Sequence, residues 1–165
     1  MSLILSGDSG VTFPNSTTQA SAGSVIQVVQ GSLNTVASSS SSSLTASGLS
    51  ASITPKFSTS KILITVNMVA TGKNQSNANN CVTLAYYKNG SLLSYITDEH
   101  GFTSSAAANF LTASHQYLDS PATTSSTTYA IYFGSTISAG VVYFNSYYNT
   151  QANNISTITL MEIAQ

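Results

Sequence analysis

The chain has 165 residues and only nine formal charges, four lysines and five acidic residues, which leave a net charge of −1. Charged residues make up 5% of the chain, against about 25% in an average soluble domain. So few basic groups exclude the basic surface that nucleic-acid binding requires, and no apolar run approaches the ~20 residues that cross a bilayer. We therefore expect neither a nucleic-acid nor a membrane partner.

Hydroxyl and amide side chains replace the missing charges. Serine, threonine and asparagine number 31, 21 and 13, while hydrophobic residues reach 42%. That apolar content is too high for a disordered chain, and the length suits one folded domain. The single cysteine, Cys81, excludes an intramolecular disulfide and a cysteine-based zinc site, so we expect a structural thiol.

Residues 1–23 differ from the rest of the chain. They contain three glycines and one proline, with few apolar side chains, a composition typical of an extended segment. We expect an N-terminal attachment arm over 1–23 and a folded domain over 24–165. Val11, Phe13 and Pro14 are the expected anchors of the arm, because they offer it apolar surface to bury.

The folded domain begins with strand patterns. Residues 25–29 are the first candidate, and a run of six serines over 38–43 indicates a flexible linker. A second strand over 49–53 stops before Pro55, which cannot donate to a ladder. Residues 61–70 alternate regularly and place Ile62, Ile64, Val66 and Met68 on one face.

The strongest local signal is Asn89-Gly90 between two apolar runs. This dipeptide favours the positive φ angles of a type I′ turn, which predicts a hairpin of strands 81–88 and 91–97. Polar loops are expected over 72–80 and 98–101, and further strands over 109–117, 128–137, 141–148 and 155–163. Eight or nine short strands without a helical period predict an all-β, antiparallel jelly-roll sandwich.

Motifs that could support catalysis are weak. Gly7-Asp8-Ser9-Gly10 spells the nucleophile segment of chymotrypsin-like proteases, but eight preceding residues cannot supply the other catalytic groups. Five acidic residues are too few for a convincing glycosidase pair. We expect no enzyme, no catalytic residues and no cofactor.

Five residues could in principle bind a metal ion: Asp98, Glu99, His100, His115 and Asp119. Consecutive strand residues point to opposite faces, so only a loop would bring the first three together. We prefer a solvated loop to a metal site, and a surface or hydrogen-bonded role for His115.

All nine tyrosines fall in the expected strands. In the pairs Tyr86-Tyr87 and Tyr147-Tyr148, alternation requires one ring of each pair to face outward from its sheet. Outward rings can stack on sugars or pack against another subunit. We take these four tyrosines as candidate exposed or interface residues and favour subunit packing over ligand binding.

Several stretches, in order along nearly the whole chain, resemble small tail-fibre-like virion proteins of tailed bacteriophages. They are residues 6–21 (SGDSGVTFPNSTTQAS), 48–55 (GLSASITP), 58–64 (STSKILI), 87–91 (YKNGS), 120–129 and 156–163 (STITLMEI). The resemblance implies a jelly roll like those of the complement C1q and tumour-necrosis-factor group, which trimerise about an apolar axis. It also implies that the arm docks on another virion protein.

These observations lead to one expected function and two alternatives. We expect a homotrimeric short tail fibre of a phage virion, anchored through its arm and displayed for host-surface contact, with a surface glycan as a possible partner. The first alternative is a capsid decoration protein whose arm bridges capsomers. The second is a free carbohydrate-binding lectin, which accounts for the tyrosines but not for the arm.

Overall fold

The computed structural model describes residues 4–6, 10–12, 18–19, 24–74, 78–137, 140–146 and 154–165. Every regular element among them is a β-strand. The strands of the main body are β4 (Val25–Leu33), β5 (Ala37–Ser39), β6 (Thr45–Ile53), β7 (Lys61–Lys73), β8 (Val82–Lys88), β9 (Ser91–His100), β10 (Asn109–Asp119), β11 (Thr127–Ser135), β12 (Val142–Phe144) and β13 (Ser156–Ile163).

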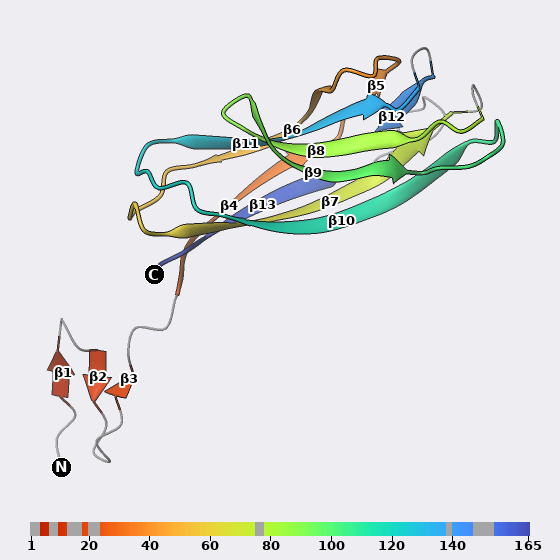
Figure 1. Ribbon diagram of the computed structural model, residues 1–165. Helices are drawn as coiled ribbons and strands as arrows, with labels where there is room; N and C mark the ends of the chain where they lie inside the picture. The colour runs from red at the N-terminus through yellow and green to blue at the C-terminus, as the bar shows by residue number, and fades with distance from the viewer. Residues whose placement is uncertain are drawn as a thin grey trace.

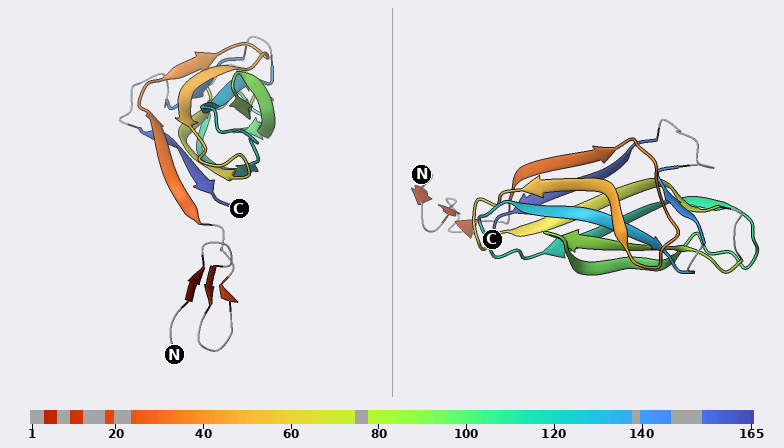
Figure 2. Two further views of the ribbon diagram at one scale, coloured as in Figure 1. Left: turned by 90° about the vertical axis from the view of Figure 1, so that its left-hand side faces the viewer. Right: turned by 90° about the horizontal axis from the view of Figure 1, so that it is seen from above.

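The strands form two antiparallel sheets that pack face to face (Figures 1 and 2). One sheet holds β4, β13, β7 and β10, and the short strands β12 and β5 extend it from the end of β7. The other sheet has the order β6-β11-β8-β9. Counting only the eight long strands, the two orders are first-eighth-third-sixth and second-seventh-fourth-fifth. This is the connectivity of a jelly roll, and it confirms the predicted fold class.

Alternating side chains from both sheets fill the core. Along β7 the face that carries Ile62, Ile64, Val66 and Met68 is at most 1% exposed, as the alternation predicts. Ile158 and Leu160 of the neighbouring strand β13 lie beside Val66 and Ile64 on the same face and are fully buried. The opposite sheet contributes a second set of buried side chains: Leu49, Ile53, Val82, Leu84, Tyr86, Tyr129, Ile131 and Phe133.

The hairpin between β8 and β9 also confirms its prediction. Asn89 and Gly90 have φ angles of 50° and 81°, as a type I′ turn requires. The Asn89 side chain accepts a 2.8 Å hydrogen bond from the backbone N–H of Thr128, so the turn is also tied to β11.

Several predicted boundaries are wrong, because long-range pairing and backbone conformation decide where a strand ends. β4 runs on to Leu33 and β6 already begins at Thr45. β7 runs on to Lys73, where it pairs with both β10 and β12, so the predicted loop starting at residue 72 begins later. β9 runs on to His100, which pairs with Val82. β12 stops at Phe144, because Asn145 adopts a left-handed φ of 60°.

The serine run is also partly structured rather than a linker. Ser38 and Ser39 lie in β5 and pair with β12. Backbone ladder bonds need no apolar side chain, and hydroxyl residues suit an exposed strand.

The N-terminal segment carries three short strands, β1 (Ile4–Ser6), β2 (Gly10–Thr12) and β3 (Thr18–Gln19). They pair with one another in a small antiparallel sheet, which lies apart from the sandwich in Figure 1. We expected an extended segment without an element of its own, and the described parts instead satisfy their backbone groups locally. Figure 1 shows this sheet at the end of the sandwich where the C-terminus also lies, opposite the ends of β9 and β12.

Candidate functional site

The structure separates the predicted tyrosines. Tyr86 is fully buried in the core, so its assignment as an exposed or interface residue is wrong. The register of β8 places it opposite Ile131, a core residue, and its hydroxyl lies 3.3 Å from Nδ1 of His115. Burial raises the pKa of the Tyr86 hydroxyl well above its ordinary value.

Tyr87 lies on the outer face and is half-buried. Its ring stacks on Tyr132 with 3.7 Å between the ring centroids. Tyr147 and Tyr148 lie outside the described residues, as do Phe13 and Pro14 of the predicted arm anchor. Val11 is in β2, where its backbone pairs with Leu5 and Gln19.

The five candidate metal ligands do not meet. His100 directs Nε2 toward the carbonyl of Thr71 at 3.1 Å, and burial lowers its pKa. His115 contacts the Tyr86 hydroxyl, and Asp119 is bonded to Tyr129 and Lys88. In the described part of the chain, no three histidine, cysteine or acidic residues are arranged to hold a metal ion.

Three of the few charged residues are buried, and each ties a loop or strand end to the sandwich. Asp119 accepts a 2.6 Å hydrogen bond from the Tyr129 hydroxyl and forms an ion pair with Lys88 at 2.9 Å. Burial raises the pKa of the Tyr129 hydroxyl, and both the hydrogen bond to Asp119 and the negative charge of that carboxylate raise it further. This cluster joins β8, β10 and β11 at one end of the sandwich.

The other two buried charges hold loops through backbone groups. Lys73 donates to the carbonyls of Thr103 and Ser105 at 3.0 and 2.9 Å. Burial of its ammonium lowers its pKa. Glu162 accepts hydrogen bonds from the side chain of Gln27 and the backbone N–H of Lys56, both at 2.7 Å. Sequence reasoning missed these roles, since nothing local marks a strand residue that bonds a distant loop.

Cys81 is buried, and its sulfur lies 3.2 Å from the carbonyl oxygen of Asp98 and 3.1 Å from the hydroxyl of Thr136. It joins the start of β8 to β9 and to the segment after β11.

The outer face of the larger sheet carries three ordered rows of side chains across β10, β7, β13 and β4. Paired residues on adjacent strands share a face, so each row follows from the register. One row is apolar: Leu118, Leu63, Met161 and Val28. The other two rows are uncharged and polar: Gln116, Thr65, Thr159 and Gln30, then Ser114, Asn67, Thr157 and Ser32.

We call these three rows the β10–β4 face. Val28 and Leu118, at the two ends of the apolar row, are 58% and 49% exposed. None of the twelve side chains carries a charge, and depletion of charge with exposed apolar side chains is typical of protein interfaces. The face can therefore contact another protein without desolvating an ion.

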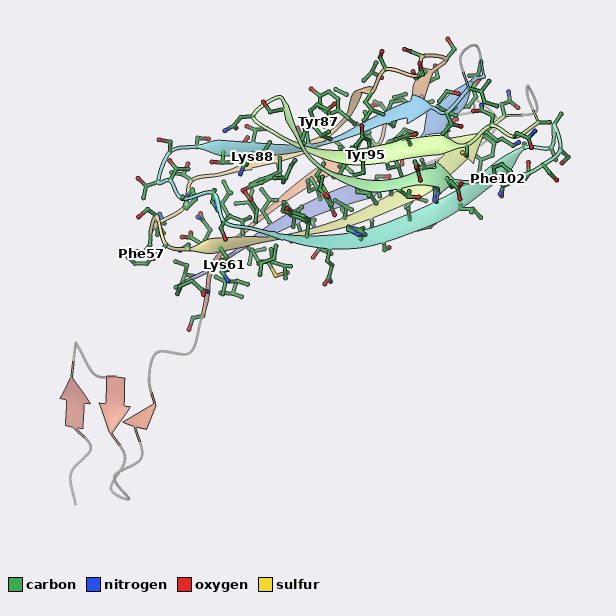
Figure 3. The ribbon with its side chains drawn as sticks, viewed as in Figure 1. Phe57, Lys61, Tyr87, Lys88, Tyr95 and Phe102 are labelled. Atoms are coloured by element: carbon green, nitrogen blue, oxygen red, sulfur yellow. The ribbon has the colours of Figure 1, made fainter. Side chains whose placement is uncertain are left out.

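The outer face of the smaller sheet differs because it is hollowed. A cavity of about 630 Å³ lies where the 41–44 segment covers β11 and faces β8 and β9. Its lining residues are Ser42, Leu44, Thr83, Tyr95, Ile96, Thr97, Asp98, Ser135 and Thr136. Figure 3 labels Tyr95 on β9 and Tyr87 on the neighbouring β8. Sequence reasoning did not find the cavity, because a segment distant in sequence builds one of its walls.

Comparisons with known proteins assign no family to the chain. No protein-family model matches the chain, and no curated protein matches it. Among solved structures it is similar to the VP2 subviral particle of infectious bursal disease virus, with 15% identity and a TM-score of 0.39. The match covers 97% of this chain and 45% of that chain. The described residues include no helix able to cross a membrane.

Proposed function

We propose that the chain is a structural protein of a bacteriophage particle, in which three copies of the jelly roll form a short tail fibre. The proposal rests on the resemblance of residues 6–21 and of the later stretches to tail-fibre-like virion proteins, and on the jelly-roll fold that this resemblance implies. The N-terminal segment would attach the fibre to another virion protein, with Val11, Phe13 and Pro14 as its anchors. No catalytic step is part of this function.

The β10–β4 face supports association between copies of the chain, and the number of three copies comes from the resemblance to tail-fibre-like proteins. An exposed apolar row flanked by hydroxyl and amide rows can be buried against a second copy without leaving an unpaired charge. The nearest charged side chain in the register is Lys61, which pairs with Ile163 beyond the apolar row. We propose that a second copy of the chain covers this face. The face carries no charge that would attract an oppositely charged protein, and a copy of the chain offers the same uncharged surface in return.

The arrangement of the ends supports display. Figure 1 shows the N-terminal sheet and the C-terminus at one end of the sandwich. The segment 101–108 lies at the opposite end, where Figure 3 labels Phe102. An arm bound to the particle would therefore leave this loop-bearing end free to meet the host surface.

The oligomeric state tests the face directly. Light scattering coupled to gel filtration should give three times the 17.1 kDa mass of one chain. Leu118→Glu should give a monomer, because association would bury an unpaired carboxylate in every copy. Leu92→Glu is the matched control: Leu92 is 46% exposed, close to the 49% of Leu118, but lies in β9 of the other sheet. A monomeric wild-type protein would rule out the trimer.

The place in the particle needs a separate experiment. The copy number of the chain relative to the major capsid protein, measured by quantitative mass spectrometry of purified particles, should be small if it is a tail fibre. A number comparable to the capsid subunits would favour a decoration protein. Absence from particles would overturn the virion role and favour the free lectin. Deletion of residues 1–23 should abolish incorporation while the jelly roll still folds.

A further inference from the structure

The cavity on the smaller sheet is built by a close approach of two backbones. Gly134 of β11 faces outward, and a Cβ at this position would lie 3.0 Å from a Leu44 methyl group and 3.2 Å from the Ser41 carbonyl. The N–H of Ser135 donates to that same carbonyl at 2.9 Å. The 41–44 segment is therefore held against β11, where it forms one wall of the cavity.

Several polar groups around the cavity have unused hydrogen-bonding capacity. Among the described residues, the hydroxyls of Ser42 and Thr83 and the carboxylate of Asp98 have no hydrogen-bond partner or ion pair. The Thr97 hydroxyl accepts a bond from the N–H of Glu99 and keeps its own hydrogen to donate. A ligand with several hydroxyl groups would satisfy all four.

An exposed aromatic ring completes the cavity. Tyr95 is 57% exposed and lies opposite Ala85, which in turn pairs with Tyr132. Because paired residues share a face, the small Ala85 side chain leaves the two tyrosines on either side of it. The face of an aromatic ring is electron-rich, so it attracts the weakly positive C–H groups of a sugar ring.

The charge around the cavity selects among ligand classes. The lining contains no lysine or histidine, and its one carboxylate is that of Asp98, so an anionic ligand would be repelled. An apolar ligand would displace water from the hydroxyl groups of the lining and offer them no hydrogen bonds in return, which is unfavourable. A neutral polyol fits both constraints, and the volume of about 630 Å³ lies within the ~300–1,000 Å³ of typical ligand pockets.

We propose that this cavity binds a neutral saccharide, with Tyr95 stacking on the sugar ring and Asp98, Ser42, Thr83 and Thr97 bonding its hydroxyl groups. The inference deepens the proposed display function and rests on it for the biological source of the sugar, a host-surface glycan. The binding itself depends only on the described side chains. The cavity and the β10–β4 face belong to different sheets, so both can be occupied at once.

Saturation-transfer NMR on the full chain tests the site. The neutral probes are the methyl glycosides of glucose, galactose, mannose and N-acetylglucosamine. Sialyllactose serves as the anionic comparison and adenosine as the aromatic one. We expect saturation transfer to at least one neutral glycoside, with an affinity reduced about tenfold by Tyr95→Ala and by Asp98→Asn, which removes a charge-assisted bond.

Phe57→Ala is the matched control, because Phe57 is 55% exposed but lies outside the cavity lining, and it should leave binding unchanged. Circular dichroism of each variant establishes that it folds. Four results would overturn the proposal: no transfer to any neutral glycoside, transfer only to sialyllactose or adenosine, wild-type affinity in both Tyr95→Ala and Asp98→Asn, or loss of binding in Phe57→Ala. A monomeric protein that binds the glycoside would overturn the trimer but not this site.

Discussion

Glu162 allows the sharpest test of how the few charges stabilise the fold. The side chain is fully buried at the end of β13. It accepts 2.7 Å bonds from Gln27 Nε2 and from the backbone N–H of Lys56, and a longer one from Phe57. Glu162→Gln keeps the shape but turns an NH₂ group toward donors. A hydrogen bond to a charged group contributes about 1.5–3 kcal/mol, so losing one of the short bonds should lower the free energy of unfolding by about 2 kcal/mol.

The same contacts predict a pH dependence. Burial alone would raise the pKa of Glu162, but hydrogen bonds from the Gln27 amide and from the backbone N–H groups of Lys56 and Phe57 outweigh it, and the pKa falls below its ordinary value of 4.5. The folded state then binds fewer protons than the unfolded state, so stability increases with pH across this range. The contribution of Glu162 is complete above pH 4.5 and is lost as the pH falls through the lowered pKa of the folded state.

Urea denaturation at pH 7 and at a series of values below pH 4.5 measures both effects. Wild type should lose stability on acidification more steeply than Glu162→Gln, and the two should converge at the lowest pH. Glu99→Gln is the control, since Glu99 is exposed on β9 and its replacement should change stability by less than about 0.5 kcal/mol. Parallel acid profiles for wild type and Glu162→Gln would refute the assignment of a stabilising buried carboxylate.

Three further predictions concern the same framework. Gly31→Ala should destabilise the fold by at least about 1–3 kcal/mol in urea denaturation, because the new Cβ would lie 2.0 Å from the Ser50 carbonyl; unchanged stability would mean that β4 and β6 separate easily. Tyr129→Phe should cost about 1.5–3 kcal/mol by the same assay, since it removes the 2.6 Å bond to the buried Asp119; a neutral effect would mean that Lys88 alone satisfies the carboxylate. Lys73→Ala should speed amide hydrogen exchange in the loop that precedes β10 while the core strands stay protected, and uniform protection would show that the loop is held by other contacts.

The fold class was predictable because its signals are local. The alternation of residues 61–70 specified which side chains of β7 enter the core, and Asn89-Gly90 specified a turn through its backbone preference. Strand ends were less predictable. Whether β7 stops at residue 70 or at Lys73 depends on its pairing with β10 and β12. These strands are distant in sequence, so the residues around position 70 do not reveal the pairing.

The surfaces were harder to predict than the core. Tyr86 and Tyr87 have the same side chain, and only the register against β11 decides that the first lies opposite the core residue Ile131. A shift of one residue would exchange their faces. The buried charges have the same difficulty, because Glu162 bonds a backbone group 106 residues away.

The distribution of charge links the two proposals. Lys73, Asp119 and Glu162 are buried, and Lys88 is paired with Asp119, so these four charges stabilise the fold rather than solvate its surface. Among the described residues, Lys56, Lys61, Asp98 and Glu99 remain, and none of them belongs to the three rows of the β10–β4 face. Such a face is costly to leave open in a chain with so little charge to prevent association. The smaller sheet keeps Asp98 beside Tyr95 at its cavity, where the carboxylate would accept hydrogen bonds from the hydroxyl groups of the proposed ligand. One sheet is therefore suited to a second copy of the chain and the other to a hydroxyl-rich ligand, and covering the first leaves the second accessible.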